Sequence, residues 1–96
     1  MATYVTLINW TDQGVRNAKD TVQRARAFRS DLERRGGKLV SIYWTQGQYD
    51  IVTTVEAPDG QTVMAALLAV AGLGNVRTET LSAFNETEME SVIQKV

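Results

Sequence analysis

Four stretches of the chain have the alternating or β-branched pattern of apolar residues that predicts a β-strand. They are residues 4–8, 39–44, 49–56 and 76–84. Only residues 45–48 separate the second stretch from the third, which is short enough for a hairpin, and Gly47 within them is suited to a positive φ angle. We therefore expect these two strands to pair antiparallel.

From Val15 to Leu32, apolar residues recur every three or four positions, and this spacing predicts an amphipathic helix. Weak helix formers gather between residues 17 and 21, so we expect a short first turn and a restart near Thr21, which would act as a second N-cap. The glycine pair 36–37 can take the left-handed conformation that closes a helix.

Two further helices are predicted in the second half of the chain. Asp59 can cap the N-terminus of a helix that runs to Ala71 and is ended by Gly72 and Gly74. The tail 85–96 predicts a short helix with three glutamates near its start, where the helix dipole favours negative charge.

The predicted order is therefore β-α-β-β-α-β followed by a C-terminal helix. With 96 residues, the chain is long enough for one domain spanning residues 1–96 and too short for two cores. This order favours an α+β, ferredoxin-like architecture, in which a four-stranded antiparallel sheet carries both main helices on one face. The other face would be left bare, and its mixture of hydroxyl, aromatic and aliphatic residues predicts contact with a second subunit.

Composition narrows the function classes. The chain has no cysteine and no histidine, which removes thiolate chemistry, the usual haem ligand and the commonest metal ligand, so we expect neither a cofactor nor a metal. The start of the chain lacks the pattern of a signal peptide and the longest apolar run is too short for a membrane span, which predicts a cytoplasmic protein without membrane contact.

The first long helix is basic, although the whole chain has a net charge of −1. Between Arg16 and Lys38 there are eight basic residues against three acidic ones. Because no nucleic-acid-binding motif accompanies them, we interpret this run as a solvated or inter-subunit face and expect no nucleic-acid partner.

Topology predicts one candidate site. The first two strands should end where the last two begin, which would gather both tryptophans and several polar side chains at one rim of the sheet. Aromatic walls with a few polar groups are typical of a small-molecule site. The candidate ligand-binding residues are Asn9, Trp10, Trp44, Tyr49, Asp50, Asn75, Arg77 and Glu79.

Each of these residues also has a structural interpretation. Arg77 would either form an ion pair with Asp50 or Glu79, or bind an anionic group of a ligand. Asp50 would act as a general base only if burial raised its pKa, and otherwise would pair with a cation or cap a turn. Trp10 and Trp44 would be core or subunit-contact anchors, or would stack on a ligand.

Several motifs resemble one known family. Residues 43–50 (YWTQGQYD), 56–59 (EAPD) and 74–80 (GNVRTET) are similar to the fingerprint of the GYD domain family of small bacterial proteins, and residues 11–14 and 36–38 also fit. The resemblance covers nearly the whole chain. It implies a dimeric α/β-barrel in which two ferredoxin-like protomers place their sheets face to face. It implies no agreed activity and supplies no catalytic residues.

Three functions follow as hypotheses, and enzymatic activity stays open among them. The first is a small-molecule-binding or sensor module assembled as a homodimer or higher homo-oligomer. The second, by analogy of fold alone, is a cofactor-free monooxygenase or isomerase acting on a small substrate. The third is a structural or interaction protein whose activity is assembly itself.

Overall fold

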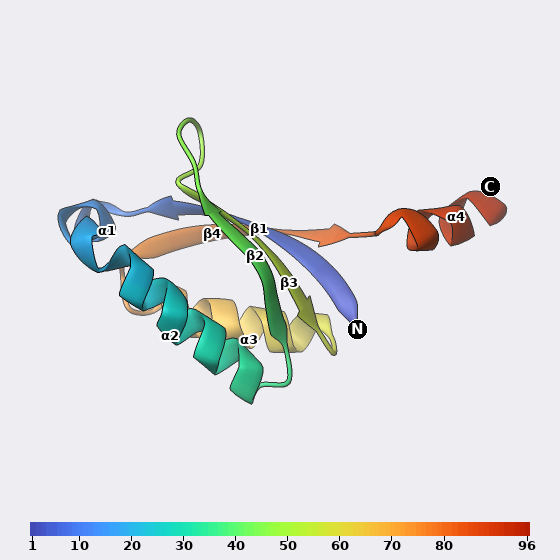
Figure 1. The fold of residues 1–96 in the computed structure, drawn as a ribbon, viewed down its shortest axis with the longest axis horizontal. Coiled ribbons are helices and arrows are strands. Elements are labelled where there is room, and N and C mark those ends of the chain that lie inside the picture. The colour runs from blue at the N-terminus through green and yellow to red at the C-terminus, as the bar shows by residue number, and fades with distance from the viewer.

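The computed structural model describes all residues from Met1 to Val96, and the elements follow one another as predicted (Figure 1). The four strands form one antiparallel sheet in the order β2-β3-β1-β4, and helices α2 and α3 lie on the same face of it. The predicted α+β, ferredoxin-like fold is confirmed. The strands are β1 (Ala2–Trp10), β2 (Lys38–Trp44), β3 (Ile51–Ala57) and β4 (Val76–Ala83), and the two main helices are α2 (Thr21–Arg34) and α3 (Gly60–Ala71).

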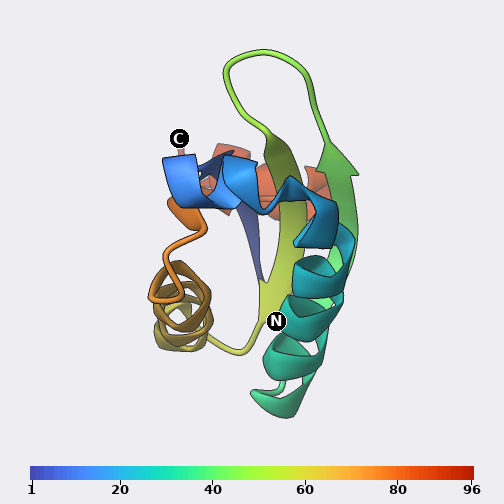
Figure 2. The ribbon, with the colours of Figure 1, turned by 90° about the vertical axis from the view of Figure 1, so that its left-hand side faces the viewer.

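The first helical region is broken as the sequence predicts. It consists of α1 (Asp12–Arg16), the short 3-10 helix η1 (Ala18–Asp20) and then α2, which starts at Thr21. Thr21 is not the N-cap that the sequence predicted, because the cap position belongs to Asp20 and no side chain caps this helix end. The hydroxyl of Thr11 caps α1 by accepting a hydrogen bond of 3.1 Å from the Gly14 N–H. The segment therefore crosses the end of the sheet before α2 runs along its face (Figure 2).

Other residues that the sequence predicts as helix caps and turn glycines have these roles in the structure. Gly36, after α2, and Gly47, between β2 and β3, have φ angles of 89° and 125°, in the left-handed region that favours glycine. Asp59 caps α3, since its Oδ1 accepts a hydrogen bond of 2.9 Å from the Thr62 N–H. That hydrogen bond also holds the pKa of Asp59 below its ordinary value, because it favours the carboxylate.

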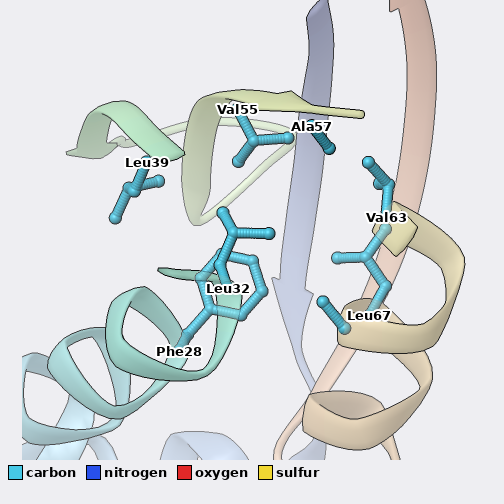
Figure 3. Close-up of a cluster of buried hydrophobic side chains, with 8 residues drawn as sticks. Phe28, Leu32, Leu39, Val55, Ala57, Val63 and Leu67 are labelled. Atoms are coloured by element: carbon cyan, nitrogen blue, oxygen red, sulfur yellow. The ribbon is translucent and has the colours of Figure 1, made fainter. Parts of the chain in front are cut away.

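The main hydrophobic core lies between the sheet and the two helices (Figure 3). Leu32 on α2 and Val55 on β3 are both only 1% exposed. Burying a side chain of this size contributes roughly 1.5–3 kcal/mol. The cluster consists of Phe28, Leu32, Leu39, Val55, Ala57, Val63, Ala66 and Leu67.

The third strand begins two residues later than predicted, at Ile51 rather than Tyr49. The side-chain hydroxyl of Thr45 donates a hydrogen bond of 2.6 Å to the carbonyl of Tyr49, and the Thr45 N–H donates one of 2.8 Å to the carbonyl of Asp50. These bonds fold residues 45–50 into a loop, so the connection is six residues long rather than four.

A β-bulge at Val40 sets the orientation of the rest of β2. Leu39 pairs with Val55, but the next pair in the register is Ser41 with Thr54, so Val40 is the extra residue. Because neighbouring side chains in a strand point to opposite faces, one extra residue moves all later side chains of β2 to the other face.

The C-terminal helix α4 (Glu86–Gln94) points away from the rest of the molecule (Figure 1). Asn85 and Glu88 form a capping box at its start, with hydrogen bonds of 2.8 Å and 2.9 Å. No other helix or strand packs extensively against α4. None of the helices has the length and apolar character needed to cross a membrane.

Candidate functional site

The predicted candidate residues lie near one end of the sheet, where β1 and β2 end and β3 and β4 begin. Asn9 is opposite Arg77 and Trp10 is opposite Val76 in the β1–β4 pair, while Trp44 is the last residue of β2. Figure 2 is viewed from this end, with α1 in front and the loop 45–50 above it. Their side chains, however, divide between the two faces of the sheet.

Both tryptophans lie on the helix side. Trp10 packs against a small cluster of buried aliphatic residues formed by Ile8, Ile51 and Val76. The indole N–H of Trp44 donates a hydrogen bond of 3.0 Å to the hydroxyl of Thr21, the first residue of α2. Trp44 therefore fastens the end of β2 to the start of α2, and it is still 40% exposed.

Asp50 caps the end of β1. Its Oδ2 accepts a hydrogen bond of 2.9 Å from the N–H of Trp10, and its own N–H donates one of 2.9 Å to the carbonyl of Ile8. The carboxylate thus continues the backbone pairing past the end of the strand. Of the roles weighed for Asp50, turn capping is the one that this geometry supports.

Asn75 holds α1 against the end of the sheet through two hydrogen bonds. Its carbonyl accepts a hydrogen bond of 3.0 Å from the Thr11 N–H, and its side-chain Oδ1 accepts one of 3.1 Å from Gln13. Gly14 approaches so closely that a Cβ atom there would overlap the Asn75 carbonyl oxygen. The contact requires glycine because there is no room for a side chain.

Tyr49 and Glu79 interact, and Asn9 and Arg77 belong to the face that carries no helix. The Tyr49 hydroxyl donates a hydrogen bond of 2.9 Å to the Glu79 carboxylate. This bond, with desolvation and the nearby negative charge, raises the pKa of Tyr49 above its ordinary value. Arg77 forms no ion pair with Asp50 or Glu79, since the salt bridges of the protein join Asp31 to Arg34 and Arg35.

The structure therefore brings the eight residues to one end but does not place them around one hollow. That they bind a ligand together stays a prediction. The acidic side chains also form no group of three or more that could hold a metal ion.

The helix-free side of the sheet, which we call the open face, carries two rows of side chains across all four strands. One row is Tyr43, Val52, Leu7 and Glu79, as the register of the three strand pairs shows. The adjacent row is Ser41, Thr54, Val5 and Leu81. Tyr43 is 66% exposed and Leu81 46% exposed. No helix covers this face of the sheet (Figure 1). The apolar strip consists of the five apolar and aromatic members of these rows, which are Tyr43, Val52, Leu7, Val5 and Leu81. A continuous strip of this kind, bordered by polar residues, is typical of a protein interface.

The sequence did not predict a cavity that lies on the opposite side of the sheet. It has a volume of about 310 Å³ and lies between α2, α3 and the sheet. Of the eight predicted residues, only Asn75 lines it. No motif marks this cavity, because it depends on how far apart the two helices pack.

These features define a small ferredoxin-like protein with an uncovered, partly apolar sheet face. The family model of the GYD domain matches residues 4–93. The chain belongs to this family, as the motifs at residues 43–50 and 74–80 predicted.

Similar proteins include the glutamine synthetase and cystathionine beta-lyase binding protein of Thermus thermophilus. It is 38% identical to this chain over 84 residues, which cover 86% of this chain and 88% of the relative. No activity of this chain follows from that name alone, but the relative is named for binding other proteins.

Solved structures with a similar fold include TTHA0845 from Thermus thermophilus, with a TM-score of 0.56 and 25% identity over 88% of this chain and 95% of that chain. MtbAldR has a TM-score of 0.61 and 15% identity, and the match covers 88% of this chain and 52% of that protein. The second likeness shows the fold alone.

Proposed function

We propose that this protein is an interaction module that forms a homodimer through its open face and, as a dimer, binds metabolic enzymes in the cytoplasm. The observation that carries the proposal is the uncovered apolar strip that crosses all four strands. Leu7 and Val52 form its centre on the two inner strands. A second copy would supply a matching strip, because both partners of a twofold dimer use the same surface.

The open face alone is smaller than the surface that a stable dimer usually buries. Four strands about 4.8 Å apart, each about seven residues long with a rise of roughly 3.3 Å, span a flat area on the order of 400 Å². A stable interface buries about 800 Å² on each partner. We therefore propose that the second copy also covers the apolar stripe of α4, formed by Met89, Val92 and Ile93, which are 46%, 36% and 59% exposed.

Four of the predicted site residues take a place in this proposal. Asn9, Arg77 and the hydrogen-bonded pair of Tyr49 and Glu79 stand at one border of the strip. Polar residues around an apolar centre are the usual arrangement of an interface, where they exclude water and fix the orientation of the partners. In this proposal they orient the second copy, whereas Trp10, Trp44, Asp50 and Asn75 hold the fold.

The choice of metabolic enzymes as further partners is supported by the Thermus relative, which is named for binding glutamine synthetase and cystathionine beta-lyase. Protein binding also agrees with the geometry better than catalysis, because Trp44, Asp50 and Asn75 are used in structural hydrogen bonds and the predicted residues do not surround a hollow. The proposal thus favours the third of the hypotheses drawn from the sequence.

The dimer is tested with Leu7→Lys, which places a charge at the centre of the strip and opposite Glu79 in the β1–β4 pair. Light scattering after size exclusion should give a dimer for the native chain and a monomer for Leu7→Lys. The matched control is Val22→Lys, an exposed position on α2, which should remain dimeric. A native chain that is monomeric at tens of micromolar, or a dimeric Leu7→Lys, would contradict the homodimer.

Enzyme binding is tested separately, with purified glutamine synthetase and cystathionine beta-lyase of the same organism. Biolayer interferometry should detect saturable binding of one or both enzymes to the immobilised dimer, and weaker binding to Leu7→Lys. If neither enzyme binds, these partners are rejected, but the evidence for the homodimer is unaffected.

A further inference from the structure

The cavity between α2 and α3 is lined by two residues that each have a buried polar atom without a hydrogen-bond partner. Figure 2 shows α2 and α3 standing apart from each other, and the cavity of about 310 Å³ lies between them and the sheet. Its walls are mainly apolar: Ile8, Ile42, Ile51 and Val76 come from the sheet, Phe28 from α2 and Val70 from α3. This volume is at the lower end of the range of about 300–1,000 Å³ for small-molecule pockets.

Thr53 contributes the polar group on the sheet side. It is only 1% exposed and lines the cavity, and its hydroxyl is buried without a hydrogen-bond partner. Almost all buried polar groups of native proteins are paired, with protein, water or ligand. An unpaired hydroxyl in a mainly apolar pocket therefore points to an acceptor or donor that enters the pocket from outside.

Arg24 on α2 contributes the charged group. Its Nη1 donates a hydrogen bond of 2.7 Å to the carbonyl of Asn17, which fixes the guanidinium against the start of η1. Its Nη2 is buried and has no partner, and no carboxylate lies within salt-bridge distance of Arg24. The other charged residues of the cavity, Asp31 and Arg34, pair with each other at 3.2 Å.

We infer that this cavity binds a small monocarboxylate with an apolar body. The apolar part would occupy the space between the helices, and the carboxylate would pair with the guanidinium of Arg24, one nitrogen of which has no partner in the protein. A guanidinium suits this role because its planar donors match the geometry of a carboxylate. The cavity lies on the helix side of the sheet, so this site is independent of the dimer through the open face.

Tryptophan fluorescence provides the test. Trp10 packs against Ile8, Ile51 and Val76, which line the cavity, whereas Trp44 is bonded to Thr21. In a Trp44→Phe background, Trp10 is the single tryptophan and reports on the pocket. Titration with hydrocinnamate should give a saturable change in its emission, and hydrocinnamyl alcohol, the neutral analogue of similar shape, should bind about tenfold or more weakly.

Two variants of α2 test whether the charge of Arg24 binds the carboxylate. Arg24→Met, which keeps an unbranched apolar stem and removes the guanidinium, should weaken hydrocinnamate binding about tenfold or more and leave binding of the alcohol unchanged. Arg26→Met, at an exposed position of the same helix, removes the same charge from the chain and should bind as the native protein does. Circular dichroism of each variant checks that the fold is intact.

Ala27→Phe addresses the space rather than the charge, because Ala27 lines the cavity and is exposed enough to accept a larger side chain. It should weaken binding of the acid and of the alcohol alike. The inference is overturned if hydrocinnamate causes no saturable change, if the acid and the alcohol bind equally, or if Arg24→Met binds the acid as tightly as Arg26→Met does.

Discussion

The hydroxyl of Tyr49 donates a hydrogen bond of 2.9 Å to the carboxylate of Glu79, and this bond joins the loop after β2 to the edge strand β4. Glu79 belongs to the same row of the open face as Leu7, Val52 and Tyr43. The bond therefore fixes a loop residue at the border of the surface that we propose as the dimer interface.

The pKa of Tyr49 provides a test of this hydrogen bond. The Glu79 carboxylate favours the neutral phenol, so the folded-state pKa of Tyr49 is raised, and the stabilisation that it gives is present below about pH 10 and lost as the pH rises through the folded-state pKa. Glu79→Gln should bring the pKa of Tyr49 back towards its ordinary value. Phenolate absorbance, after subtraction of the titration of Tyr49→Phe, isolates this residue among the three tyrosines. An equal pKa in both proteins would show that Glu79 does not act on Tyr49.

Asp50 should matter for stability through its hydrogen bond to the Trp10 N–H. Asp50→Ala removes the acceptor and leaves a partly buried donor unpaired, so we expect a loss of about 1–3 kcal/mol in the free energy of unfolding. Asp50→Asn keeps an oxygen acceptor and should lose clearly less. Urea unfolding of the two variants measures the difference. Equal losses would mean that the charge of Asp50, and not its acceptor atom, stabilises the fold.

Gly14 should tolerate no side chain. A Cβ atom at this position would overlap the carbonyl oxygen of Asn75, so Gly14→Ala forces α1 away from the end of the sheet and should cost about 2–4 kcal/mol. Gly60→Ala is the control, because it lies at the start of α3 with open space on most sides and should be neutral or slightly stabilising. Thermal unfolding of both variants compares them. A Gly14→Ala protein as stable as Gly60→Ala would show that α1 is not held tightly by Asn75.

Local signals made most of the fold predictable. The restart of the helix at Thr21, the cap at Asp59 and the left-handed turn at Gly47 each depend on a few neighbouring residues, and the structure confirms all three. The order of the elements then restricts the topology to few arrangements, and the ferredoxin-like sheet follows.

The arrangement of the candidate site was less predictable, because it depends on details of pairing and packing. The extra residue at Val40 decides that Trp44 points to the helix side, and nothing in the alternation of β2 announces a bulge. The close approach of Gly14 to Asn75, and the distance between α2 and α3 that opens the cavity, are properties of the packed structure. Sequence reasoning could therefore place residues at one end of the sheet, but could not assign them to a face.

The apolar stripe of α4 gives the last prediction, which depends on the proposed homodimer. Ile93 is 59% exposed, and no helix or strand of its own chain packs extensively against α4, so Ile93→Asp should leave the unfolding of the monomer nearly unchanged. In the dimer the same substitution would bury a charge against the second copy, which should weaken dimerisation about tenfold or more. Gln94→Asp, at the next position and off the stripe, introduces the same charge and should dimerise as the native chain does. Analytical ultracentrifugation over a range of concentrations measures the dissociation constants. If both variants dimerise equally well, α4 does not pack on the second copy, and the interface must then be made by the open face alone.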